Sequence, residues 1–133
     1  MKTMIFTILI CLCLTGCTVR NVENSIVGQW ELYDAKRADT GKKYSIQELY
    51  GTGIALSNRL TLNKDGTFSK YIGITDNLTS YEGRYTIHHN TIIFQFQNGN
   101  EEEAIYSPSN HEIEYFNTHD FSIPVNEYFR MVK

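Results

Sequence analysis

The stretch LTLNKDGTF (Leu60–Phe68) decides the fold of this chain. Ile54, Leu56 and Leu62 belong to a period-two pattern of apolar residues, which is typical of a strand with one buried face. Asp-Gly within a four-residue polar turn predicts a tight hairpin, because glycine accepts the positive φ that such turns need. The returning strand is predicted at residues 67–73.

The same pattern extends outward from this hairpin in both directions. Strands are predicted at residues 27–34, 54–62, 67–73, 81–87, 91–97, 102–106, 112–116 and 125–132. Asn98-Gly99 is a second strong hairpin signal. One short helix is compatible with residues 44–50, where Ile46 and Leu49 lie three apart. The chain is therefore expected to be all-β, a small up-and-down antiparallel barrel of about eight strands, because closure removes exposed strand edges.

The N-terminus reads as an export signal. Lys2 precedes an apolar run, Met4–Leu14, and a small residue, Gly16, comes just before Cys17. The run is shorter than the roughly 20 residues that a membrane-spanning helix needs. A charged start, a short apolar run and a small-residue cleavage site together indicate a secretory signal peptide.

Leu14-Thr15-Gly16-Cys17 is similar to the bacterial lipobox. The resemblance implies cleavage after Gly16 and lipid (palmitate) on the Cys17 thiol. Residues 1–16 are then a removed signal peptide, 17–25 a lipidated tether and 26–133 the folded domain. The expected location is the cell envelope, exported and lipid-anchored to a bacterial membrane, and the outer membrane if the cell is Gram-negative, because Thr18 replaces the aspartate of the enteric retention signal. The alternative is an ordinary signal peptide with a chance cysteine.

The composition of the mature part limits which partners and which kinds of site are expected. Cleavage leaves 117 residues, enough for one domain with one core. Eleven basic and fifteen acidic residues remain, a formal charge of −4. A nucleic-acid-binding domain usually shows a basic stripe, so no nucleic acid is expected as a partner. Cys11 and Cys13 leave with the signal, so neither a disulfide nor a cysteine metal site is expected.

Three motifs in order resemble the lipocalin-like domains of bacterial lipoproteins. They are Gly28-Gln29-Trp30, the hairpin Leu60–Phe68, and Gly83-Arg84-Tyr85-Thr86-Ile87 followed by Asn90-Thr91-Ile92. The resemblance covers residues 26–133. It implies that Trp30 lies at the closed end of a barrel, with an arginine of the last strand packed over it. Arg130 is the matching residue, and Trp30 and Arg130 would form a structural closure rather than a ligand site.

An eight-stranded barrel is just wide enough to be filled by side chains or to hold one small ligand. Leu32, Leu62 and Tyr128 are expected to point inward. The candidate ligand lining is Leu56, Phe68, Tyr81, Tyr85, Phe94, Phe96, Tyr106 and Tyr115. Residues 35–53 and 117–124 would line the mouth. The same aromatic side chains could instead form a packed core. The inward set of the last strand stays open, because residues 125, 127, 129 and 131 compete with 126, 128, 130 and 132.

Sequence motifs for catalysis and for metal binding are weak. His88 and His89 are adjacent in a predicted turn, and His111 and His119 are isolated, so no two histidines show ligand spacing. The run Glu101-Glu102-Glu103 fits a solvated strand edge that discourages pairing. No nucleophile motif such as Gly-Xaa-Ser-Xaa-Gly is present. Neither an enzyme nor a cofactor nor a metal site is expected.

Two functions follow from these patterns. The first is a membrane-anchored lipoprotein that binds a small apolar or amphipathic ligand in a lipocalin-like barrel. The second is a structural or protein-interaction lipoprotein with a filled barrel, whose partner is another protein of the envelope. A connected cavity larger than about 300 Å³ would favour the first.

Overall fold

The computed structural model describes residues 24–44, 48, 56–74, 77–118 and 124–133. The signal peptide, Cys17, His119 and nearly all of the helix considered near residues 44–50 lie outside these ranges. None of the helices in the described ranges has the length and apolar character to cross a membrane.

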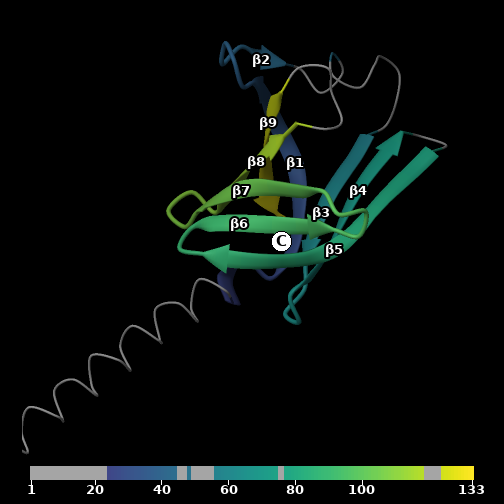
Figure 1. The fold of residues 1–133 in the computed structure, drawn as a ribbon. Coiled ribbons are helices and arrows are strands. Elements are labelled where there is room, and N and C mark those ends of the chain that lie inside the picture. The colour runs from purple at the N-terminus through teal and green to yellow at the C-terminus, as the bar shows by residue number, and fades with distance from the viewer. Residues whose placement is uncertain (1–23, 45–47, 49–55, 75–76, 119–123) are drawn as a thin grey trace, which may run out of the picture.

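In the described part of the chain, nine strands form one antiparallel sheet (Figure 1). They are β1 (Gly28–Arg37), β2 (Lys43–Tyr44), β3 (Leu56–Leu62), β4 (Thr67–Ile74), β5 (Asn77–His88), β6 (Thr91–Phe96), β7 (Glu101–Ser107), β8 (Glu112–Asn117) and β9 (Val125–Met131). β1 pairs with β9 and with β3, so eight strands close into an up-and-down barrel. The predicted fold is confirmed. β2 is an extra short strand beside the second half of β1.

Both predicted Asp-Gly and Asn-Gly hairpins form. Gly66 has φ +84° and Gly99 has φ +88°, the positive values that these turns need. Asn63 N–H donates to the Thr67 carbonyl at 2.9 Å and closes the first turn. Local turn chemistry therefore sets the register of β3 against β4 and of β6 against β7.

Alternation along each strand builds the core. In β7, residues 102, 104 and 106 are buried and residues 101, 103 and 105 are exposed. The buried apolar cluster consists of Ile26, Trp30, Leu60, Leu62, Phe68, Ile92, Phe94, Ala104, Tyr106, Ile113, Tyr115 and Phe129. Gly83 is required within β5, because a Cβ there would lie 2.0 Å from the Gln95 carbonyl oxygen and 2.9 Å from the Phe68 ring.

The barrel has two distinct ends. The end that we call the N-terminal end holds a helical turn at residues 24–26, the turns at 63–66, 89–90 and 108–111, and the C-terminus. The opposite end holds β2, the turn at 97–100 and the start of β9. Figure 1 shows β2 at the end away from the first described residues, which are purple. The candidate sites lie at these two ends.

Candidate functional site

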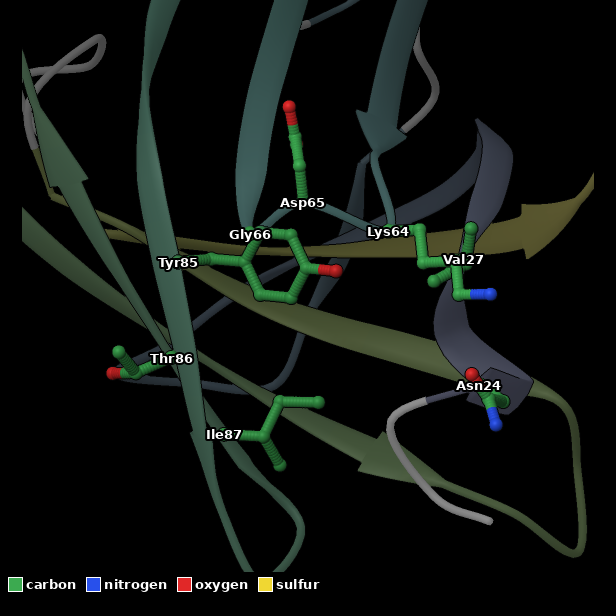
Figure 2. A pocket seen from close by; sticks show the side chains of 8 residues that line it. All are labelled: Asn24, Val27, Lys64, Asp65, Gly66, Tyr85, Thr86 and Ile87. Carbon is green, nitrogen blue, oxygen red and sulfur yellow. The ribbon is translucent and has the colours of Figure 1, made fainter. Parts of the chain in front are cut away.

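A cleft of about 450 Å³ opens at the N-terminal end (Figure 2). Its lining comes from three segments that are far apart in the sequence: the turn before β1, the β3–β4 turn and the end of β5. The lining residues are Asn24, Val27, Lys64, Asp65, Gly66, Tyr85, Thr86 and Ile87.

The stagger of the strands produces this cleft. β4 pairs with β5 only as far as Thr67 opposite Arg84, whereas β5 runs on to His88 in its pairing with β6. The last residues of β5 therefore extend past β4. Tyr85 N–H donates to the Gly66 carbonyl at 2.9 Å, which holds the β3–β4 turn against β5. Beyond that bond the strand faces open space on one side.

The pleat of β5 decides which side chains face the cleft. Tyr85 and Ile87 are half-buried and Thr86 is exposed. Figure 2 shows the Tyr85 ring and Ile87 extending toward the side where Val27 lies, whereas Thr86 points the other way. The inner wall of the cleft is thus formed by an aromatic ring and two aliphatic side chains.

Polar groups form the rim. The Tyr85 hydroxyl donates to the Asn63 carbonyl at 2.7 Å. The Asp65 carboxylate accepts from the Thr67 hydroxyl at 2.6 Å and from the Thr67 N–H at 3.0 Å. These bonds hold the pKa of Asp65 below its usual value. Lys64 is exposed on the rim. The arrangement suits an amphipathic molecule, with its apolar part inside and its polar part at the rim.

An apolar plug closes the barrel beside the cleft. Ile26 is fully buried within the core cluster. The indole N–H of Trp30 donates to the Ile26 carbonyl at 2.9 Å, and the Trp30 and Tyr106 rings meet edge to face at 6.1 Å. The plug ties residues 24–26 to the barrel, so Asn24 and Val27 are fixed at the cleft.

The opposite end contains charged groups inside the barrel. The Lys70 ammonium lies 3.1 Å from Glu127 Oε1, and their side chains are 2% and 0% exposed. The amides of Asn58 and Asn117 each donate to the Glu127 carboxylate at 2.8 Å. The Lys70 Nζ also lies 4.0 Å from the centroid of the Tyr115 ring. We call these five residues the interior polar cluster.

Sequence reasoning missed the interior polar cluster, although the alternation contained the signal. Asn58 has the same parity as Leu60 and Leu62, and Lys70 has the same parity as Phe68. Glu127 has the parity of the buried Val125 and Phe129. Polar residues at inward positions of several strands are the pattern to look for.

The predicted ligand-lining residues divide into three groups. Phe68, Phe94, Tyr106 and Tyr115 are at most 2% exposed, and they belong to the packed core. The ring centroids of Phe68 and Phe94 lie 4.9 Å apart, and those of Phe94 and Tyr115 lie 5.3 Å apart. Tyr81, Tyr85 and Phe96 are half-buried, and Tyr85 lines the cleft. Leu56 lies in β3, with its side chain outside the described part of the structure.

The predicted packing of Arg130 over Trp30 is wrong. β9 buries Val125, Glu127 and Phe129, so Arg130 lies on the outer face. Its guanidinium carbon is 3.7 Å from the centroid of the Tyr33 ring. Trp30 itself is fully buried, as expected for a residue that closes the barrel.

Tyr128 also points outward, contrary to expectation. Its hydroxyl donates to Glu114 at 2.9 Å. Burial against its neighbours and this hydrogen bond raise the pKa of Tyr128 to about 12. The acidic run in β7 is divided as well, because Glu102 is 7% exposed and points inward while Glu101 and Glu103 are exposed.

Within the described ranges, no group of three His, Cys, Asp or Glu side chains could hold a metal ion. The rings of His88 and His89 lie with their centroids 4.6 Å apart and their planes tilted by 59° at the β5–β6 turn. His89 and His111 have positive φ, 56° and 49°, and both lie in turns at the N-terminal end.

Comparisons with known proteins agree with this architecture. Residues 26–115 match the family model described as a lipocalin-like domain. A lipocalin-like protein from Bacteroides uniformis ATCC 8492 superposes with a TM-score of 0.56 at 16% identity, covering 81% of this chain and 99% of that one. At this identity the likeness concerns the fold alone.

Two further solved structures are more distant. Fatty-acid-binding protein 1 of Echinococcus granulosus has a TM-score of 0.49 at 9% identity, covering 83% of this chain and 99% of that one. The REP1-NXSQ fatty acid transporter has a TM-score of 0.46 at 11% identity, covering 83% and 98%. No curated protein is similar enough in sequence to count as a relative.

Proposed function

The chain belongs to the lipocalin-like domain family, and from this premise we propose that it is a lipid-anchored protein of the bacterial envelope that binds one small amphipathic ligand. The binding site is the cleft at the N-terminal end. Its volume of about 450 Å³ lies in the range of about 300–1,000 Å³ that is typical of small-molecule sites. An apolar inner wall beside a polar rim is the observation that carries the proposal.

The proposed site differs from the expected one. Of the two stretches expected to line the mouth, the described residues 35–44, 117–118 and 124 belong to the opposite end of the barrel, where the interior polar cluster lies. There the inward groups already bond to one another: Glu127 accepts from Lys70, Asn58 and Asn117. At the N-terminal end Val27, Tyr85 and Ile87 are only half-buried. Apolar surface available for a ligand therefore supports the N-terminal end as the site.

The proposed role is binding rather than catalysis. The Asp65 carboxylate holds the β3–β4 turn through Thr67, and the Tyr85 hydroxyl donates to Asn63. Both groups are engaged in hydrogen bonds that shape the cleft.

A comparison of two isoleucine variants tests the site. The mature chain is titrated with dansyl-undecanoate, and the fluorescence gain gives the Kd. Ile87→Trp fills the cleft, whereas Ile105→Trp adds the same ring on the outer surface, where Ile105 is 40% exposed. We expect Ile87→Trp to weaken binding by about tenfold or more, which corresponds to roughly 1.4 kcal/mol, and Ile105→Trp to bind as the parent does. Equal binding by both variants, each with an unchanged unfolding temperature, would remove the cleft as the site.

The anchor is tested separately. Cells expressing the full chain are fed an alkyne-tagged palmitate, and the purified protein is examined for label. We expect label on the parent and on Cys13→Ala, and none on Cys17→Ala, because the Cys17 thiolate is the group that takes the lipid. Label that persists in Cys17→Ala would contradict the proposed anchor. Fractionation of the same cells places the protein in the inner or the outer membrane.

The filled-barrel alternative has one observation in its favour. The side chains of Phe94, Tyr115 and Phe129 are 0% exposed, so the chain itself fills the interior around them. A barrel filled in this way can act as a protein-interaction module of the envelope. Tyr71 and Ile105, each 40% exposed on the outer surface, are then the first residues to substitute in a search for a partner. Absence of dansyl-undecanoate binding by the parent chain would favour this second function.

A further inference from the structure

We infer that the ligand of the cleft is a lipid with an anionic headgroup, taken from the membrane to which the chain is anchored. This inference rests on the proposed function, since it names the ligand of the same site. It follows from where the cleft lies, from the apolar side chains exposed at the same end of the barrel and from the charge at the rim of the cleft.

The cleft lies at the end of the barrel that leads to the anchor. Asn24 lines the cleft, and Cys17 is seven residues before it. Seven residues of extended chain span at most about 25 Å. From this end β1 runs ten residues, about 33 Å, to the opposite end. The lipid on Cys17 therefore keeps the N-terminal end of the barrel close to the bilayer.

Exposed apolar side chains gather at the same end. Met131 is 37% exposed and Val132 is 40% exposed. The Val132 N–H donates to the Gln29 carbonyl at 2.8 Å, which fixes these C-terminal residues beside the start of β1. Together with the half-buried Val27, they expose apolar surface at the end of the barrel where the described chain begins. Such surface is favourable next to lipid and unfavourable next to water.

Charge at the rim selects the headgroup. Lys64 is exposed on the rim, and Figure 2 shows it on the same side as Val27. The neighbouring Asp65 points away from the cleft in the same view, and its carboxylate is bound to Thr67. The ammonium of Lys64 is thus the cationic group of the rim, and Asp65, which also lines the cleft, has its carboxylate bonded to Thr67. A phosphate or carboxylate on the lipid complements this charge.

Photo-crosslinking in vesicles tests the inference with the full lipidated chain. Vesicles of phosphatidylcholine carry a trace of one diazirine-acyl lipid: phosphatidylglycerol, phosphatidylcholine or a free fatty acid. After irradiation, mass spectrometry locates the adducts. We expect adducts in the peptides that contain Val27 and Ile87, several-fold more with the anionic probes than with the phosphatidylcholine probe. The phosphatidylglycerol and fatty-acid arms decide between phosphate and carboxylate.

A pair of lysine variants provides the matched control. Lys64→Glu removes the cation at the rim, whereas Lys42→Glu makes the same change at an exposed position of the opposite end. We expect Lys64→Glu to reduce the anionic adducts to the phosphatidylcholine level and Lys42→Glu to leave them unchanged. Equal labelling by all headgroups, or labelling confined to other peptides, overturns the inference.

One rival occupant is the acyl chain on Cys17 itself. In that case the cleft peptides of the lipidated chain stay unlabelled, and those of Cys17→Ala become labelled on the same vesicles, which also overturns the inference. The dansyl-undecanoate titration separates the two proposals. If Ile87→Trp still weakens binding of that water-borne probe about tenfold or more, the cleft remains a ligand site and only the membrane source is lost.

Discussion

At the opposite end of the barrel, Lys70 and Glu127 are buried as an ion pair with two asparagine amides bound to the same carboxylate. At the N-terminal end, by contrast, an apolar plug stands beside an open cleft with half-buried walls. Buried charges are tolerated only when nearly every partner is in place. The opposite end therefore requires a fixed arrangement of its side chains. Half-buried apolar surface carries no such requirement, which supports the N-terminal end as the proposed ligand site.

The largest effect is expected from breaking the interior polar cluster. Glu127→Ala leaves the Lys70 ammonium buried without its counter-ion, and we expect a loss of about 3–5 kcal/mol in the free energy of unfolding. Arg59→Ala, which removes the exposed pair with Glu31 at 3.1 Å, should cost at most about 1 kcal/mol. Urea denaturation of both variants measures the difference. Similar losses in the two variants would show that the cluster is not the rigid part of the barrel.

A second comparison uses one substitution at two depths. Ile113→Ala removes a side chain with 0% exposure from the core and should cost about 2–5 kcal/mol. Ile87→Ala, on the half-buried wall of the cleft, should cost less than half as much, because less apolar area returns to water. If thermal or urea unfolding gave Ile87→Ala the larger loss, the wall would be part of the core and the cleft would not be an adaptable site.

Gly83 tests how tightly β4, β5 and β6 are held together. A methyl group there meets the Gln95 carbonyl at 2.0 Å, so the backbone has to shift. We expect Gly83→Ala to cost about 1–3 kcal/mol, as is usual for overpacking. Gly99→Ala is the control. Nothing lies within 4 Å of a Cβ added at Gly99, so the φ of +88° is the source of strain for an alanine at this position. A Gly83→Ala variant as stable as the parent would mean that β5 can move away from β6.

The smallest effect concerns Tyr128 on the outer face. Its pKa of about 12 lies above the usual value of about 10. The neutral phenol is therefore favoured in the folded state, and the stabilisation is complete below pH 10 and lost as the pH rises through 12. We expect Glu114→Gln to lower the pKa, measured from the ¹³Cζ shift of Tyr128. An unchanged pKa in this variant would assign the whole shift to burial.

Local sequence patterns predicted the strands and the two tight hairpins because both depend on neighbouring residues. They could not predict which way β9 faces, since its two alternating sets each mix apolar and polar residues. Burial of Glu127 is decided by Asn58, Lys70 and Asn117, which come from other strands. The consequence was the wrong placement of Arg130.

Local sequence patterns could not predict the cleft either. It exists because β5 extends past β4 by four residues, and this stagger is a property of barrel closure rather than of any one strand. Val27 and Ile87 carry no signal of their own, being ordinary members of apolar patterns. Tyr85 was predicted to contact a ligand, but as part of the barrel lining rather than of this cleft.

Methyl NMR of the mature chain titrated with dodecanoate tests the central claim most directly, because it reports both ends of the barrel in one experiment. The account predicts that the methyl signals of Val27 and Ile87 shift with saturation while those of Ala35 and Val125, buried at the opposite end, move little. Large shifts at Ala35 and Val125, with Val27 and Ile87 unchanged, would place the ligand at the opposite end and contradict it.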